Sequence, residues 1–233
     1  MSIIGISGKI GVGKDTVGRI IQYLTSECGD SNSPRHRTYT EFLQKGGGSN
    51  LRNFDQHYVS DWEVKKFAGK LKTIASLLTG IDVEKFEDQE FKKKEMGEQW
   101  GMTYRTFLQK LGTEAMRDGL HTNVWVNALF ADYKMSYTQH PDIEYVDHKA
   151  YPNWIITDLR FPNEYKAVKE KRGITIRVVR PVHALSQENN AGILHSSETA
   201  LDEATFDYEI INDGEIVDLI EKVKTILIKE KII

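Results

Sequence analysis

Cysteine is almost absent from this chain, because Cys28 is the only one among 233 residues. An intrachain disulfide and a cysteine-based zinc site are therefore excluded, and a reducing compartment is expected. No run of 18 apolar residues occurs, and the N-terminus lacks a basic segment followed by an apolar one, so neither a membrane span nor a secretory signal is predicted. The seven histidines show no paired metal spacing. We expect a cytoplasmic protein.

An excess of positive charge is also missing. The 31 Lys and Arg side chains are outnumbered by 34 Asp and Glu, for a formal net charge of −3. This balance argues against broad adhesion to nucleic acid or to an anionic membrane, because such adhesion requires surplus cations that neutralise phosphates. With 39% hydrophobic and 28% charged side chains, the chain is expected to form one domain with surface excursions.

What the sequence does contain is a glycine-rich segment at its start. An apolar strand pattern over residues 3–7 leads into GKIGVGKDT at residues 8–16, and an amphipathic helical pattern follows to about residue 27. The glycines let the backbone N–H groups point inward, toward the positive end of the helix. Lys14 adds a point charge for nucleotide phosphates, and Thr16 offers a hydroxyl for phosphate or Mg²⁺, although Asp15 intervenes where the strict pattern has Ser or Thr. The segment predicts a phosphate-binding loop; the alternative is a glycine-rich turn that caps a helix.

The rest of the chain alternates strand and helix patterns. Strands are predicted at 64–67, 154–157, 174–179 and 208–211, and helices at about 71–78, 82–96, 103–117, 123–134, 163–171 and 216–226, the second of these fully solvated. Residues 29–61 and 135–152 read as polar excursions, the first of them mobile. Strands separated by helices predict an α/β fold with a parallel sheet, whose ligands bind at the carboxyl ends of the strands. The loop at 8–16 and Asp158 both lie at such ends.

Several motifs together resemble one group of kinases. The loop order G-x-x-G-x-G-K-x-T is similar to that of nucleoside monophosphate kinases of the adenylate kinase type, which carry glycine where this chain has Asp15. Five other stretches resemble the deoxynucleoside monophosphate kinases of phages and bacteria. They are WIITDLRFPNE at 154–164, FAGKLK at 67–72, the run 103–117 with Trp125, HSSE at 195–198 and INDG at 211–214.

This resemblance implies a P-loop NTPase fold with a five-stranded parallel sheet in a single domain. The implied core comprises residues 1–28, 62–80, 153–180 and 206–233. A helical region at 81–134 would bind the nucleoside monophosphate, and a lid at 181–203, flanked by Arg177 and Arg180, would close over the phosphates. The implied partner is the monophosphate substrate, with no nucleic acid and no membrane; a homodimer is left open.

The resemblance also assigns roles to individual residues. Lys14, Asp15 and Arg160 are the implied catalytic residues, and Thr16 with Asp158 would organise Mg²⁺. ATP would be held by Lys9, Gly11, Val12, Gly13, Lys14, Asp15 and Thr16, with Asn212 beside the adenine. The implied contacts to the acceptor monophosphate are Lys72, Arg105, Arg117, Trp125, Asp158, Arg160 and Glu164.

Each role has a structural alternative. Asp158 could cap the following helix, and Arg160 could pair with Glu164 on the surface. Arg105 and Arg117 could lie on solvated helix faces, Trp125 could be a core residue, and 212–214 forms a turn in any protein.

The predicted function is ATP-dependent phosphorylation of (deoxy)nucleoside 5′-monophosphates, with direct in-line transfer and Mg²⁺. The nearest alternatives are a kinase of dephospho-coenzyme A or phosphomevalonate type and a non-catalytic nucleotide-binding module. A GTP switch is disfavoured because Asp158 is followed by Leu-Arg-Phe rather than x-x-Gly and because Asn-Lys-x-Asp does not occur. A nucleic-acid-associated ATPase is disfavoured by the acidic balance.

Overall fold

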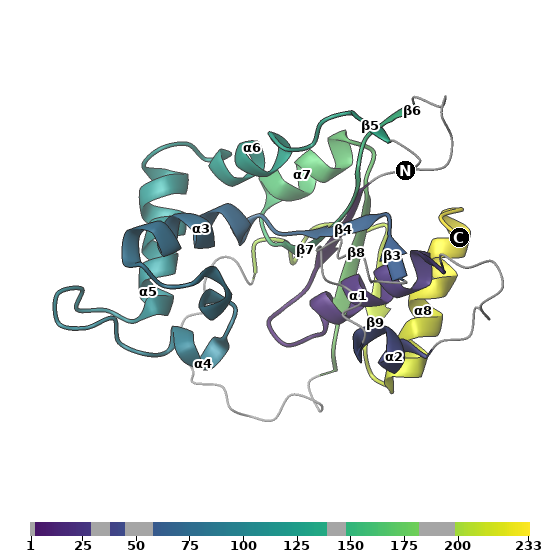
Figure 1. Cartoon of the computed structure of the whole chain (residues 1–233), viewed down its shortest axis with the longest axis horizontal. Helices are drawn as coiled ribbons and strands as arrows, with labels where there is room; N and C mark the ends of the chain where they lie inside the picture. The colour runs from purple at the N-terminus through teal and green to yellow at the C-terminus, as the bar shows by residue number, and fades with distance from the viewer. Residues whose placement is uncertain (1–2, 29–37, 45–57, 139–147, 182–198) are drawn as a thin grey trace. The chain divides into compact units, whose positions relative to one another are not determined.

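The computed structural model describes residues 3–28, 38–44, 58–138, 148–181 and 199–233, which fall into two compact units (Figure 1). The first unit contains the described residues up to Lys65 and from Lys134 onward, and the second contains Lys66–Tyr133. The second unit takes in most of the predicted helical region 81–134 together with residues 66–80.

A five-stranded sheet with only parallel pairings forms the centre of the first unit. Its strand order is β4-β7-β1-β8-β9, so the strand that leads into the glycine-rich loop is central. Continuous runs of β-branched residues suit strands that are covered on both faces, and every residue of the central strand is buried. The strands are β1 (Ile3–Ser7), β4 (Trp62–Lys65), β7 (Asn153–Leu159), β8 (Ile174–Val179) and β9 (Tyr208–Ile211).

The sequence predicted this sheet well. The expected strands at 174–179 and 208–211 are confirmed to the residue. The strand expected at 64–67 lies two residues earlier, because Phe67 already caps the next helix. The strand expected at 154–157 runs on through Asp158 to Leu159, so Asp158 lies inside the strand rather than after it.

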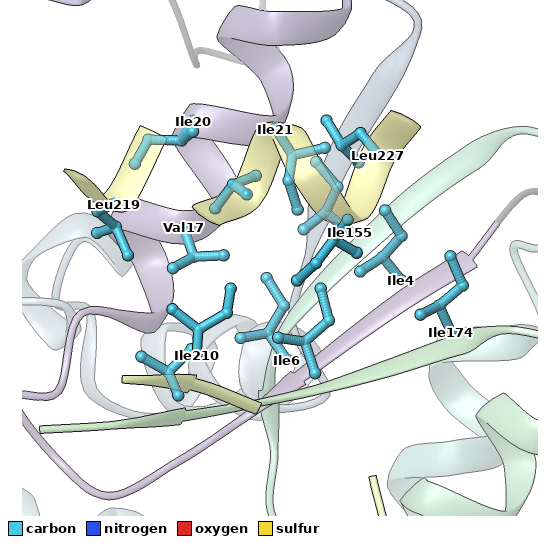
Figure 2. Close-up of a cluster of buried hydrophobic side chains, with 14 of the residues drawn as sticks. Ile4, Ile6, Val17, Ile20, Ile21, Ile155, Ile174, Ile210, Leu219 and Leu227 are labelled. Carbon is cyan, nitrogen blue, oxygen red and sulfur yellow. The ribbon is translucent and has the colours of Figure 1, made fainter. Parts of the chain in front are cut away.

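Helices cover the two faces of the sheet. Helices α1 (Lys14–Thr25) and α8 (Ile216–Lys229) lie side by side on one face, where their apolar side chains meet those of the strands (Figure 2). Ile4 and Ile6 of β1 belong to this cluster. The intervening Gly5 faces Val168 of α7 (Pro162–Glu170), so α7 covers the opposite face, as strand alternation requires. The helix expected to reach residue 27 ends at Thr25, where Ser26 turns to extended backbone.

The second unit is helical. Its elements are α3 (Ala68–Thr79), the 3₁₀ turn η1 (Val83–Phe86), α4 (Gln89–Lys92), α5 (Tyr104–Gln109), the π-helical segment η2 (Lys110–Asp118) and α6 (Val124–Phe130). The prediction of one solvated helix over 82–96 is wrong. Asp88 caps a new helix there by accepting hydrogen bonds from the N–H groups of Glu90 and Phe91, and Phe86 is buried against Ala75.

The predicted excursions contain some regular structure. Within 29–61, the described residues form α2 (Tyr39–Gln44), whose Phe42 is buried, and β3 (Tyr58–Ser60), which pairs with β2 (Ser26–Cys28). Strands β5 (Ser136–Thr138) and β6 (His148–Ala150) pair at the base of the second excursion. The glycine run at 46–48, the HSSE motif and most of the predicted lid lie outside the described residues. Across the described ranges, no helix is both long enough and apolar enough to cross a lipid bilayer.

Candidate active site

The glycine-rich loop joins β1 to α1 in a conformation that depends on its glycines. Gly8, Gly11 and Gly13 have φ angles of 147°, 79° and 102°. A Cβ atom on Gly8 would lie 2.3 Å from the carbonyl oxygen of Val178 in β8, and one on Gly13 would lie 2.7 Å from Nδ2 of Asn212. The backbone of the loop is therefore pressed against the sheet where side chains would not fit, and it brings its N–H groups to the start of α1.

Lys14 is the first residue of α1 and reaches back over the loop. Its Nζ atom donates hydrogen bonds to the carbonyl oxygens of Gly8 (2.6 Å) and Lys9 (2.7 Å). The ammonium group thus lies against the loop itself, at the positive end of a twelve-residue helix. A cation and a helix N-terminus therefore lie together at the loop, an arrangement that favours an anion.

The turn after β9 supports the loop from one side. The Nδ2 atom of Asn212 donates to the carbonyl oxygen of Val12 (2.9 Å), while its backbone N–H donates to Val179 (2.7 Å). Lys222 of α8 fixes the same turn by donating to Ile211 O (2.6 Å) and to the Asp213 carboxylate (2.7 Å). The bond from Lys222 is the main reason that the pKa of Asp213 is lowered. Asn212 therefore joins the glycine-rich loop to β8 through hydrogen bonds.

The carboxyl end of β7 supports the loop from another strand. Gly5 of β1 pairs with Ile156, but Ser7 pairs with Leu159, so Thr157 and Asp158 together face a single residue of β1. At this bulge, Oγ1 of the buried Thr157 donates to Oδ1 of Asp15 (2.8 Å). The sequence does not point to Thr157, because this residue resembles any other buried strand residue and the local pattern does not reveal the bulge.

Asp158 lies in the last part of β7, Arg160 in the turn that follows, and Glu164 in the first turn of α7. The Glu164 carboxylate is only 2% exposed and accepts hydrogen bonds from the backbone N–H groups of Arg160 (2.9 Å) and Phe161 (3.1 Å). It therefore caps α7 and shapes the turn that carries Arg160. The alternative in which Arg160 pairs with a surface Glu164 does not hold as stated, because Glu164 is buried.

Arg177, which flanks the predicted lid, is bonded within the first unit. It lies opposite Ser7 in the sheet and donates to Asp202, with contacts to its carbonyl (3.1 Å) and its carboxylate (2.8 Å), while its guanidinium lies over the Phe206 ring. Nearby, Asp207 accepts from Lys169 and Thr175. Burial alone would raise the pKa of Asp207, but these bonds outweigh it and the pKa is lowered.

The remaining predicted site residues belong to the second unit. Lys72 pairs with Glu87, which Lys66 also approaches at 3.5 Å. Burial raises the pKa of Glu87, yet the hydrogen bond and charge of Lys72 turn the net shift downward. Arg105 lies on α5 and donates to Gln89 (3.2 Å).

Two further predicted residues lie in the interior of this unit. Arg117 is only 9% exposed, so it does not lie on the solvated face that its charged neighbours suggested. Trp125 is 5% exposed and its indole N–H donates to the carbonyl oxygen of Gly112 (2.9 Å) in η2. This bond joins the indole to the π-helical segment, and its burial makes Trp125 a core residue of the unit.

The oxygen donors near the loop suit Mg²⁺ rather than a transition metal. Within the described ranges there is no group of three or more His, Cys, Asp or Glu that could hold a metal ion. Mg²⁺ is commonly held by one or two protein oxygens together with substrate phosphates and water. The Thr16 hydroxyl and the carboxylates of Asp15 and Asp158 are donors of that kind.

A parallel sheet with a glycine-rich loop after its central strand, and a lysine at the start of the following helix, defines the α/β P-loop kinase fold. Within this class, the chain belongs to the deoxynucleotide monophosphate kinase family, whose family model matches residues 57–223. This match covers β7, Arg160 and the helical unit, and it begins after the glycine-rich loop at residues 8–16.

Two curated relatives agree with this family. The chain is 30% identical over 125 residues to a "Putative deoxynucleotide monophosphate kinase" of Acanthamoeba polyphaga mimivirus, which is 50% of this chain and 60% of that protein. It is 28% identical over 130 residues to the "Deoxynucleotide monophosphate kinase" of Enterobacteria phage T4, which is 56% of this chain and 46% of the phage protein. The chain thus matches about half the length of each relative.

Proposed function

We propose that this protein uses ATP and Mg²⁺ to phosphorylate deoxynucleoside 5′-monophosphates to diphosphates. The observation that carries the proposal is the phosphate loop, where the Lys14 ammonium lies against the carbonyls of Gly8 and Lys9 at the start of α1. Family membership supports the choice of a deoxynucleotide as acceptor over the coenzyme A and mevalonate alternatives.

ATP would bind with its phosphates in the loop. The backbone N–H groups of residues 9–16 and the Lys14 ammonium would hold the β- and γ-phosphates. Lys14 would exchange its two carbonyl contacts for phosphate oxygens, which are stronger acceptors because they are charged. Asn212, whose turn is fixed by Lys222, would lie beside the adenine.

Thr16 and Asp158 are the residues that would hold Mg²⁺. When bound, the ion neutralises charge on the phosphate oxygens and so favours the transition state. Asp158 is half-buried at the β7 bulge, so the strand fixes the backbone that carries its carboxylate.

The acceptor monophosphate would be held by cations. Arg160 is carried by a turn that the buried Glu164 holds in place, and its guanidinium can contact two phosphate oxygens at once. We assign supporting contacts to Lys72, Arg105 and Arg117, while Trp125 would shape the acceptor site from the core of the helical unit.

The reaction requires no covalent bond to the protein. An oxygen of the acceptor phosphate attacks the γ-phosphorus of ATP, the bond from that phosphorus to the β–γ bridging oxygen breaks, and ADP leaves with the electron pair. The protein contributes alignment of the two anions and stabilisation of charge.

The cytoplasmic location of the protein stays a prediction.

The test is an assay of ADP release with a panel of deoxy- and ribonucleoside monophosphates, dephospho-coenzyme A and phosphomevalonate. We expect turnover with one or more deoxynucleoside monophosphates. Turnover with only the last two compounds would replace the acceptor assignment, and ATP binding without any turnover would indicate a binding module.

Two variants locate the chemistry. Lys14→Ala should lower kcat by at least about 10²-fold, since it removes a charge that stabilises the transition state, whereas Lys224→Ala on the exposed part of α8 should have no effect. Arg160→Ala should weaken acceptor affinity more than ATP affinity. Lost ATP affinity with unchanged acceptor affinity would contradict the role given to Arg160.

A further inference from the structure

We infer that Thr157 is a positioning residue that holds the Asp15 carboxylate at the phosphate loop, so that this carboxylate favours magnesium-bound ATP over free ATP. The inference rests on the proposed use of ATP and adds a residue that neither the motif nor the family match assigns. Its basis is the hydrogen bond from Thr157 Oγ1 to Asp15 Oδ1.

Asp15 presents an electrostatic problem for a site that binds anions. Asp15 is the second residue of α1, directly after Lys14, and it is exposed to solvent. A negative charge there repels a bare triphosphate and attracts a cation bound to that triphosphate. A carboxylate free to rotate would spread this effect over many positions, whereas a fixed carboxylate acts at one position.

Thr157 is positioned to hold the Asp15 carboxylate in one orientation. The residue is 2% exposed, and its hydroxyl reaches Asp15 across 142 positions of sequence. The bulge in β7 begins at this residue, and bulges next to active sites commonly re-aim a side chain.

The methyl group of Thr157 is held equally closely. A Cβ atom on Gly18 of α1 would lie 2.7 Å from Cγ2 of Thr157, so the absence of a side chain at position 18 is what lets the threonine approach the helix. The χ1 rotamer is therefore set by packing on one side and by the hydrogen bond on the other. One oxygen of Asp15 is engaged by a neutral donor, which orients the whole carboxylate while leaving it charged.

The chain offers a matched control in the same sheet. Thr175 of β8 is fully buried, and its hydroxyl donates to the Asp207 carboxylate (2.7 Å), away from the phosphate loop. Thr175→Val and Thr157→Val each remove a hydrogen bond from a buried threonine to an aspartate while keeping the shape of the side chain. Thr175→Val also removes the acceptor of the Asp207 backbone N–H (3.2 Å), so its general effect on stability should be at least as large. Any general effect of such a loss on stability appears in both variants.

The experiment measures the dissociation constant of ATP by calorimetry, once with Mg²⁺ and once with EDTA. The quantity compared between variants is the dissociation constant in EDTA divided by that in Mg²⁺. Thr157→Val should lower this ratio about tenfold, the factor expected for losing a hydrogen bond to a charged group. Thr157→Ser keeps the hydroxyl and should retain the wild-type ratio, as should Thr175→Val. Asp15→Asn removes the charge itself and should lower the ratio at least as far as Thr157→Val. The double variant should fall no further than Asp15→Asn, because one residue acts through the other.

An unchanged ratio in Thr157→Val, equal losses in the two valine variants, or effects that multiply in the double variant would each overturn the inference. Should Thr157→Val fail to fold, Thr157→Ala removes the same hydroxyl with a smaller side chain. Failure of the proposed function is distinguishable, since a wild-type protein that turns over no monophosphate still yields the binding ratio.

Discussion

Two glycines of one loop should respond very differently to the same substitution. Gly8 and Gly11 both have positive φ angles, 147° and 79°. A Cβ atom on Gly8 would lie 2.3 Å from the backbone oxygen of Val178, but one on Gly11 would meet no atom within 4 Å. Gly8→Ala therefore combines backbone strain with a collision against a rigid strand, whereas Gly11→Ala carries strain alone.

The magnitudes follow from these two contributions. An alanine at the φ of Gly11 costs about 1–2 kcal/mol, partly offset by about 0.4–1 kcal/mol from the less flexible unfolded chain. At Gly8 the strain is about 1–3 kcal/mol, and relieving the collision means separating β1 from β8 at a further cost of about 1–3 kcal/mol. We expect Gly8→Ala to lower the free energy of unfolding by about 3–5 kcal/mol and Gly11→Ala by about 1 kcal/mol.

Urea unfolding without nucleotide measures the difference directly, because bound ligand would mask it. With a slope of about 2–3 kcal/mol per molar urea, the midpoint of Gly8→Ala should fall by about 1 M or more relative to Gly11→Ala. Coincident midpoints would show that the loop does not press against β8 as described.

Other substitutions test the support around the site. Gly18→Ala should lower the melting temperature and kcat together, although alanine favours helices by about 1 kcal/mol, because the new Cβ would lie 2.7 Å from Thr157 Cγ2; a raised melting temperature with normal turnover would contradict this. The lowered pKa of Asp207 means that its contribution to stability is present above the ordinary value of 3.8 and is lost as pH falls through the lowered pKa. Asp207→Asn should therefore lower the free energy of unfolding at pH 7. The difference in this free energy between variant and wild type, measured by urea unfolding, should become smaller toward pH 3, and a difference that does not vary with pH would refute the role given to the Asp207 charge. Trp125→Phe removes the indole donor to the Gly112 carbonyl and should destabilise by about 1 kcal/mol in the same assay, so an unchanged midpoint would argue against that bond.

The sequence predicted the architecture because its signals are local. Runs such as Ile174–Val179 carry the strand pattern in consecutive residues, and the loop at 8–16 is defined by glycine spacing alone. The prediction of one helix over 82–96 was wrong because it also used only local signals. Abundant charge suggested a solvated helix, but Asp88 acts as a cap and Phe86 packs inward, and only the tertiary arrangement distinguishes these outcomes.

The candidate site was predictable only in its motif residues. Lys14 and Asn212 could be proposed from sequence because each belongs to a recognisable short pattern. Thr157 could not, since its role depends on a bulge created by pairing with β1 and on a partner 142 residues away. Glu164 was expected at the acceptor or on the surface, yet its burial as a helix cap follows from how β7 and α7 meet.

The sheet helps to hold the glycine-rich loop in the shape that its glycines permit. Val178 lies next to Gly8, Asn212 donates to Val12, and Thr157 donates to Asp15, so β8, the turn after β9 and β7 each contribute one contact. Ordering a backbone residue costs about 1–2 kcal/mol, and a loop that had to order itself around its ligand would lose that amount of binding energy at each position. Under the proposed function, the energy of binding ATP would remain available for aligning it with an acceptor, because folding has already fixed these residues.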